Sequence, residues 1–128
     1  MAGSVIVTDS GFGPDTHGGG WLDMAPDASP EALRAGLEGA EAIRIAFPAF
    51  SDGRGFTLAA RLRRMGFAGR LRAAGHVIAD QYAMARRAGF DEVQIDAALA
   101  ARQPEPQWLA RADWQAHDHR HRLGRRIG

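Results

Sequence analysis

An acid, an arginine and two glycines stand together in the segment SDGRG, residues 51–55. If a helix begins there, its free backbone amides and the Arg54 guanidinium can hold a phosphate, sulfate or carboxylate group. The same residues also suit a structural turn, since Asp52-Gly53 favours a turn and Asp52 can cap the helix or pair with Arg54. The segment matches neither a Walker phosphate loop nor the GxGxxG pattern. Its candidate ligand-binding residues are Ser51, Asp52, Gly53, Arg54 and Gly55.

A second polar segment, AAGHVIADQ at residues 73–81, begins in a predicted strand and runs past its end. On a helix that starts at His76, the side chains of His76 and Asp80 share a face and can act as general base and orienter. A solvated or capping histidine is the alternative. The further ligand-binding candidates are Gly75, His76 and Gln81, and the candidate catalytic residues are Asp80 and Arg54.

The segment HDHRHRLGRRIG, which begins at His117, is rich in histidine. His117 and His121 can share a metal ion if the segment is helical, because they then lie one turn apart. Alternating histidine and arginine at a chain end is more typical of a solvated tail. We therefore predict no metal site, and we expect residues 104–128 to be a partly disordered extension of a single domain at residues 1–103.

Composition excludes several kinds of chemistry. All 16 basic residues are arginine, so this chain supplies no lysine for a Schiff base, for pyridoxal phosphate or for a phosphate loop. Cysteine is absent too, which excludes disulfides, thiol redox chemistry and cysteine-ligated iron–sulfur or zinc sites from this chain alone. We predict no intrinsic cofactor, and the sequence leaves open whether a flavin or a nicotinamide is borrowed.

The net charge of +1 arises from 16 basic and 15 acidic residues that are scattered along the chain. That pattern gives no electrostatic footprint for nucleic acid or for an anionic membrane. No secretion signal is seen, and no apolar run approaches the roughly 20 residues that span a bilayer. We expect a soluble, cytoplasmic protein that binds neither nucleic acid nor membrane.

Strand-like and helix-like segments alternate along the chain. Strands are predicted at residues 4–12, 42–47, 69–74 and 91–95, with a long loop at 13–28. Helices are predicted at about residues 30–40, 55–65, 76–88 and 96–101. Ser29 is expected to cap the first helix and Asp96 the last, because both are good N-cap residues.

This succession predicts an α/β fold with a parallel sheet of about four strands and βαβ crossovers, in two or three layers. Four strands are too few for a complete (β/α)8 barrel, so a flavodoxin-like sheet or a partial barrel remains. Strands covered on both faces should be continuously apolar, yet polar residues interrupt these. Those residues are Arg44, Arg70, Arg72 and Gln94. Either some stand at strand ends, or one sheet face is partly open or covered by a partner.

An internal similarity supports the alternation. RRMGFAGRLRAAG at residues 63–75 lies over RRAGFDEVQIDAA at residues 86–98, with a period of 23 residues. In each copy two arginines suit the last helical turn, and Gly66 or Gly89 can end the helix in a left-handed cap. The phenylalanine that follows can fold back on the helix. The same helix-to-strand connection is therefore predicted twice.

The stretch FPAFSDGRGFTLAARLRRMGFAGRLRAAGHVIADQ, followed by RRAGFDEVQI, resembles a bacterial family known as domain of unknown function 934. The opening VIVTDSGFGPD is similar to that of its alphaproteobacterial members, so the resemblance covers roughly residues 4–100. The residues that match the family pattern are Asp52, Gly53, Arg54, Gly55, Gly75, Asp80 and Gln81. His76 stands where an acidic residue is usual in the family, which makes it a weaker catalytic candidate than Arg54, Asp52 or Asp80.

The resemblance implies a companion of assimilatory sulfate and sulfite reduction, usually encoded near the reductases. The family is also described as an oxidoreductase of sulfite reduction, a label that rests on this association and is not a mechanism. We therefore expect an accessory protein that contacts sulfite reductase, another sulfur-assimilation enzyme or an electron donor. A small enzyme or module that binds an oxyanion or phosphate at the carboxyl ends of the strands is the alternative, and a structural homo-oligomer is the third reading. Whether the chain is an enzyme stays open.

Overall fold

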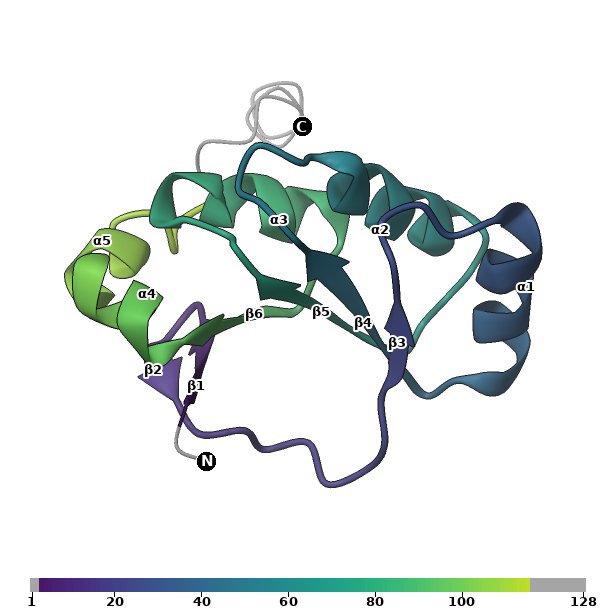
Figure 1. Ribbon diagram of the computed structural model, residues 1–128, viewed down its shortest axis with the longest axis horizontal. Helices are drawn as coiled ribbons and strands as arrows, with labels where there is room; N and C mark the ends of the chain where they lie inside the picture. Colours follow the sequence, from purple (N-terminus) through teal and green to yellow (C-terminus); the bar gives the residue numbers. More distant parts are fainter. Residues whose placement is uncertain (1–2, 116–128) are drawn as a thin grey trace, which may run out of the picture.

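The computed structural model describes residues 3–115, which form one six-stranded sheet with helices packed on one of its faces (Figure 1). The strands are β1 (Ser4–Thr8), β2 (Gly11–Gly13), β3 (Leu22–Met24), β4 (Ala42–Phe47), β5 (Arg70–Gly75) and β6 (Glu92–Asp96). The helices are α1 (Pro30–Gly39), α2 (Arg54–Arg64), α3 (Tyr82–Ala88), α4 (Ala97–Arg102) and α5 (Glu105–Leu109), and a 3-10 turn, η1, spans Ala79–Gln81. None of the described helices has the length and apolar character needed to cross a membrane.

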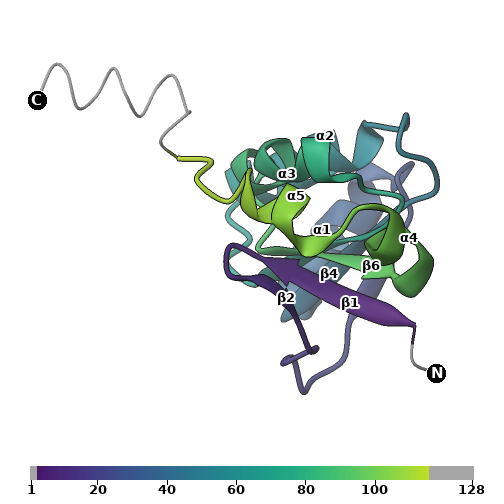
Figure 2. The same cartoon turned by 90° about the vertical axis from the view of Figure 1, so that its left-hand side faces the viewer.

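The predicted α/β class is confirmed, and the sheet is mostly parallel. Its strand order is β2-β1-β6-β5-β4-β3, with parallel pairing from β3 through to β6. The order follows the chain from β3 to β6, and α2 and α3 lie side by side on one face (Figures 1 and 2). This arrangement corresponds to the two-layer, partial-barrel alternative, because a flavodoxin-like sheet carries helices on both faces.

The direction of the N-terminal strand, β1, contradicts the prediction of a wholly parallel sheet. β1 pairs antiparallel with β6, in the register Ser4 opposite Asp96, and antiparallel with β2 on its other side. A tight turn at Asp9 and Ser10 returns the chain directly from β1 to β2 without a crossover helix, so that pair is antiparallel. The pairing of β1 with β6 is a long-range contact that no connection determines. Two short strands, β2 and β3, also lie within or beside the segment predicted to be a long loop.

The two faces of the parallel strands have opposite character. Ile43, Ile45 and Phe47 of β4 are buried toward the helices, whereas Arg44 and Ala46 alternate to the other face. The same alternation places Arg70 and Arg72 of β5 and Gln94 of β6 on that second face. The chain segment between β2 and β3 runs across it, as Figure 1 shows. The polar interruptions therefore lie on a face that the chain itself partly covers.

The predicted helix ends are confirmed. Ser29 Oγ accepts a hydrogen bond from the Ala32 amide at 3.1 Å, and Asp96 Oδ1 accepts one from the Leu99 amide at 2.8 Å. Gly66 and Gly89 have φ of 102° and 115°, the left-handed conformation expected after α2 and α3.

The repeated segments share one further contact. Arg63 donates to the carbonyl oxygen of Phe67, and Arg86 donates to that of Phe90. Both phenylalanines are buried. In each repeat, therefore, the first arginine donates a hydrogen bond to the carbonyl oxygen of the phenylalanine four residues later.

The helix predicted at residues 76–88 is shorter than expected. Ile78 has an extended backbone, with φ −96° and ψ 163°, and helical structure begins only at Ala79. His76 and Asp80 are therefore not paired on one helical turn, and the predicted base–orienter geometry is wrong. The Gln81 side chain accepts a hydrogen bond from the Ile78 amide at 3.1 Å, which fixes this late start.

The beginning of the predicted C-terminal extension packs on the domain. Trp108 of α5 is 1% exposed, and its ring lies 6.1 Å from that of Tyr82, edge to face. Its Nε1 donates to the Gln103 carbonyl at 2.8 Å. Residues 116–128, which include His117 and His121, lie outside the described residues.

Candidate functional site

The β4–α2 loop carries the acid and the arginine that the sequence singled out, and they bind each other. Arg54 Nε donates to Asp52 Oδ1 at 2.9 Å, and Arg54 Nη2 donates to Oδ2 at 2.7 Å. The Arg54 amide also donates to Oδ1, at 3.2 Å. Hydrogen bonds from the guanidinium, then from the amide, lower the pKa of Asp52 from 3.8 to about 2. The geometry favours the ion-pair alternative for these two residues.

Gly55 has a packing role in this loop. A Cβ atom at Gly55 would lie 2.5 Å from the Phe47 ring, far inside van der Waals contact. The ring of Phe56 packs against the same Phe47 at 5.0 Å between centroids. A Cβ atom at Gly53, by contrast, would come no closer than 3.8 Å to its nearest neighbour, an ordinary contact. Gly55 therefore lets the first turn of α2 sit directly on the end of β4.

Gly75, the last residue of β5, and His76, directly after it, both contact the backbone of Phe47. Gly75 has φ of 122°, and a Cβ there would meet the Phe47 carbonyl oxygen at 2.5 Å. The His76 amide donates to that oxygen at 2.9 Å. The two segments predicted as sites are thus joined through the backbone at the carboxyl ends of β4 and β5.

Gln81 provides the second link between these loops. Its Nε2 donates to the Phe50 carbonyl at 2.7 Å, while its Oε1 accepts from the Ile78 amide. Phe50 itself is 59% exposed, so the loop presents an aromatic ring to solvent from a braced backbone. Asp80 points elsewhere and pairs with Arg111 at 2.5 Å. The two candidate catalytic residues, Arg54 and Asp80, are therefore each paired with a different partner and not with each other.

A cavity of about 290 Å³ lies at the carboxyl ends of β5 and β6. Its polar lining consists of Ser4, Gly75, His76, Gln94, Asp96 and Arg102. Of the predicted site residues, Gly75 and His76 line it. Ser4 was missed because its place depends on the antiparallel pairing of β1 with β6, which puts it opposite Asp96. Arg102 was missed because it lies at the far end of α4, away from any predicted loop.

A second polar cluster, on the sheet face opposite the helices, surrounds Arg72. Its side chain is fully buried and binds Glu92, also buried, together with Asp15 at 2.8 Å and Gln94 at 2.9 Å. Trp21 lies over the guanidinium, 4.2 Å from ring centroid to Cζ. Burial disfavours the charged form, but the hydrogen bonds to Asp15 and Glu92 outweigh it and raise the pKa of Arg72.

The neighbours of Arg72 extend this cluster across the strands. Arg70 also binds Glu92, and Arg44 binds Asp23 through two hydrogen bonds. Asp15 and Trp21 come from the segment that crosses the sheet, and Asp23 lies in β3, directly after it, so the cluster fastens this segment to the strands. The sequence pattern identified the polar residues that interrupt the strands. It could not identify their partners, because these are distant in the chain: Asp15 and Arg72 are 57 residues apart.

The titratable residues offer no metal centre in the part of the chain that is described. Within residues 3–115, no group of three or more histidine, aspartate or glutamate side chains is placed to hold a metal ion. His76 has no acidic residue on a shared helical turn, because helical structure begins after it. The chemistry available at the strand ends is therefore hydrogen bonding and charge recognition by His76, Arg102 and neighbouring amides.

Comparison with known proteins gives one match. The family model described as "Bacterial protein of unknown function (DUF934)" matches residues 21–120. Neither the curated proteins nor the solved structures contain a match to this chain. The matched span includes both strand-end loops and α5, and it starts at Trp21, after β1 and β2.

Proposed function

Since the chain belongs to the bacterial family of unknown function DUF934, we propose that it is an accessory protein of assimilatory sulfate and sulfite reduction. In this proposal it works in the cytoplasm, through contact with sulfite reductase, another sulfur-assimilation enzyme or the reductase's electron donor. The oxidoreductase label attached to such proteins would then describe the complex. This chain has no cysteine for thiol redox chemistry or for ligating an iron–sulfur cluster, and the proposal assigns electron transfer to a cofactor of the partner.

The main observation in favour of a protein-contact role is Phe50, whose ring is exposed while its backbone is held by a hydrogen bond. The Gln81 side chain holds its carbonyl at 2.7 Å, and Gly55 and Gly75 hold the flanking backbone against Phe47. The ring remains 59% exposed. A large aromatic side chain on a rigid backbone loses little conformational entropy on binding, which is the property of an interface anchor.

The family-pattern residues support the same reading. Asp52 and Arg54 bind each other, Gln81 bridges two loops, and Gly55 and Gly75 allow close backbone approach. These contacts shape a surface, in which Asp52 and Arg54 neutralise each other's charge.

Growth of a deletion strain on sulfate and on cysteine tests the proposal. We expect the deletion to slow growth on sulfate only, wild type to restore it, and Phe50→Ala to restore it poorly. Leu22→Ala is the matched control, because Leu22 of β3 is also exposed, at 41%, and pairs with Ile43 near the opposite, amino end of β4. Normal growth of the deletion strain on sulfate contradicts the proposal.

The strand-end cavity favours a second candidate function, a small module or enzyme that binds an oxyanion or a phosphate. Arg102 and His76 line a space of about 290 Å³, large enough for such an ion, at the edge where parallel α/β sheets bind ligands. Arg72, one of the polar residues that interrupt the strands, is buried and bound to Glu92 and Asp15, so its guanidinium is not free for this role.

Thermal unfolding in sulfate or phosphate tests this second candidate. We expect either ion to raise Tm of the wild type and Arg102→Gln to abolish the rise. Arg54→Gln serves to test the β4–α2 loop in the same way, and Arg34→Gln of α1 is the control for loss of an exposed charge. An equal rise in Tm for all four proteins indicates a general salt effect and no site.

A further inference from the structure

The outer surface of α2 and α3 carries arginine side chains, and neither helix contains an acidic residue. The two helices, RGFTLAARLRR and YAMARRA, contain six arginines and neither aspartate nor glutamate. They lie side by side over the sheet in both views (Figures 1 and 2). Their buried residues face the sheet, so the remaining positions form one solvent-facing surface.

Three of the six arginines bind groups of their own domain. Arg54 pairs with Asp52, and Arg86 pairs with Asp9 and the Phe90 carbonyl. Arg63 donates to the carbonyls of Phe67, Gly69 and Gly89 and pairs with Asp91. The three that remain are Arg61, Arg64 and Arg87. None of these three forms an ion pair with any residue in the described range 3–115.

Exposed apolar side chains lie among these arginines. Met84 of α3 is 51% exposed, and Met65, which caps α2, is 36% exposed. Met84 lies one helical turn after Gln81, whose side chain reaches the exposed Phe50. We call the surface formed by Arg61, Arg64, Met65, Met84 and Arg87 the basic helical face. Methionine and arginine are both enriched where proteins bind other proteins.

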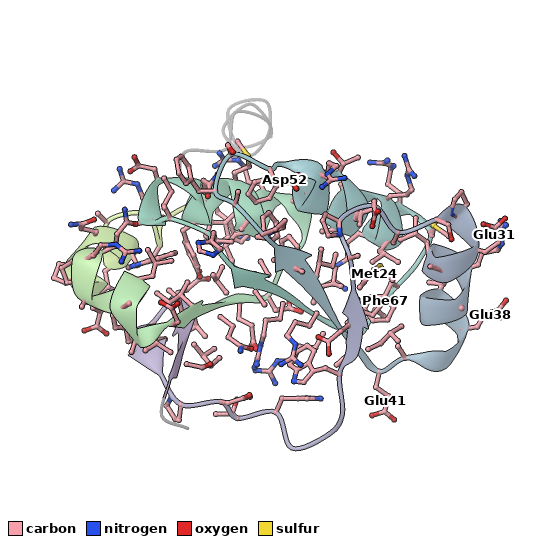
Figure 3. The ribbon with its side chains drawn as sticks, in the orientation of Figure 1. Met24, Glu31, Glu38, Glu41, Asp52 and Phe67 are labelled. Carbon is pink, nitrogen blue, oxygen red and sulfur yellow. The ribbon has the colours of Figure 1, made fainter. Side chains whose placement is uncertain are left out.

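The aspartates that border the two helices, Asp9, Asp52 and Asp91, are each bound by one of the helices' own arginines. Glu31, Glu38 and Glu41 project from α1 and the segment after it, at the opposite end of the view from α4 and α5 (Figure 3). Glu92 and Asp15, on the far face of the sheet, are engaged by Arg70 and Arg72. Because the bordering aspartates are already paired, Arg61, Arg64 and Arg87 contribute positive charge to this surface that the near-neutral total conceals.

We propose that the basic helical face binds an acidic protein surface with an apolar centre. The inference deepens the proposed function, on which it rests for the partner's identity, because it assigns the contact surface and the partner's charge. Arg61, Arg64 and Arg87 steer and orient the partner's carboxylates, while Met84 and Phe50 are covered by its apolar groups.

A nucleic acid is a poorer fit to the same surface. Specific and non-specific nucleic-acid sites neutralise many phosphates, often with lysine and arginine in a continuous stripe. Here three arginines without an ion pair among the described residues are interleaved with methionines, and the chain has no lysine at all. The mixture of charge and apolar side chains corresponds to a protein interface.

Photo-crosslinking in cells tests the face with the full chain. The photoreactive residue p-benzoylphenylalanine replaces Met84, and in a control it replaces Ala35 of α1. We expect a discrete crosslinked protein from position 84 and none from position 35. Mass spectrometry identifies it, and its affinity for the full chain is then measured with the purified protein.

Charge reversal provides the decisive comparison. Arg64→Glu is expected to weaken binding at least about tenfold, and Arg61→Glu/Arg64→Glu more, because carboxylates would then face carboxylates. Arg34→Glu is the matched control: it reverses one exposed arginine on α1 and is expected to leave the affinity unchanged. Rising salt should weaken the wild-type complex, since exposed charges are screened.

The outcomes separate this inference from the proposed function. The inference is overturned if position 84 gives no crosslinked product, or if the product is a second copy of this chain or a nucleic acid. It is also overturned if Arg61→Glu/Arg64→Glu leaves the affinity for the crosslinked protein unchanged. An acidic partner from sulfur assimilation supports both proposals. An acidic partner outside sulfur assimilation supports the basic helical face and contradicts the proposed function.

Discussion

Gln81 Nε2 lies 2.7 Å from the carbonyl oxygen of Phe50, a residue 31 positions earlier in the chain. This contact joins the loop after β4 to the loop after β5. Through its other amide atom, Gln81 also accepts from the Ile78 amide and so sets where η1 begins. One side chain therefore determines both the shape of the strand-end surface and the exposure of Phe50.

Replacing Gln81 with alanine removes both hydrogen bonds. We expect Gln81→Ala to lower the free energy of unfolding by about 1–2 kcal/mol, because each net hydrogen bond contributes about 1 kcal/mol. Urea denaturation measures the change. Gln107→Ala, at an exposed position of α5 whose side chain forms no hydrogen bond with described residues, should have little effect. Equal effects of the two substitutions would show that the bridge does not stabilise the fold.

The two glycines of the β4–α2 loop should respond differently to a methyl group. Gly55→Ala places Cβ 2.5 Å from the Phe47 ring and is expected to cost about 1–3 kcal/mol, as overpacking does. Gly53→Ala meets nothing closer than 3.8 Å and is expected to change stability by less than about 0.5 kcal/mol. Chemical denaturation of both variants provides the check, and similar stabilities would rule out the packing role of Gly55.

Neutralising Glu92 should be far more damaging than neutralising a surface acid. Glu92→Gln leaves the buried Arg72 with less compensating charge, so we expect a loss of about 3 kcal/mol in unfolding free energy. Glu38→Gln, on the exposed side of α1, is the control. The double variant Arg72→Met/Glu92→Gln should cost less than the sum of its single variants, because the two residues interact directly. Additive costs would contradict the coupling.

Acid should weaken the fold through aspartates that bind arginine. Hydrogen bonds from Arg72 lower the pKa of Asp15, and those from Arg54 lower the pKa of Asp52 to about 2. The unfolded chain, with ordinary values near 3.8, then binds more protons than the folded chain, so stability falls as the pH drops from about 5 toward 2.

Thermal unfolding across that pH range measures the effect. Asp15→Asn/Asp52→Asn should flatten the decline, because neither asparagine titrates. Asp113→Asn, at a position without an ion-pair partner among the described residues, should leave the decline unchanged. A slope that is the same in all three proteins would assign acid sensitivity to other groups.

Local signals in the sequence predicted much of the fold. The caps at Ser29 and Asp96 and the left-handed glycines, Gly66 and Gly89, depend only on neighbouring residues, and the structure confirms them. The antiparallel place of β1 depends on pairing with β6, about 90 residues away, which no local pattern encodes. The start of η1 was mispredicted because Gln81 overrides the helical periodicity of the preceding residues.

The sequence predicted that the two candidate loops lie together at the strand ends, and it predicted only some of their contacts. The rule that ligands gather at the carboxyl ends of parallel strands selected the two loops that the structure brings together. The sequence raised the pairing of Asp52 with Arg54 as one of two alternatives and could not choose between them, and it gave no sign that Asp80 pairs with Arg111 of the C-terminal segment. Pairing among charged residues depends on side-chain geometry, which sequence spacing leaves open.

The place of β1 between β2 and β6 has a consequence for synthesis on the ribosome. β1 is translated before its partner β6, which ends at Asp96, so β1 has no place in the parallel sheet until β6 has emerged. The strands from β3 to β6, in contrast, pair in the order in which they are translated. We therefore expect the β1–β2 hairpin to join the sheet after β6, and the segment that carries Asp15 to be fixed over Arg72 late in folding.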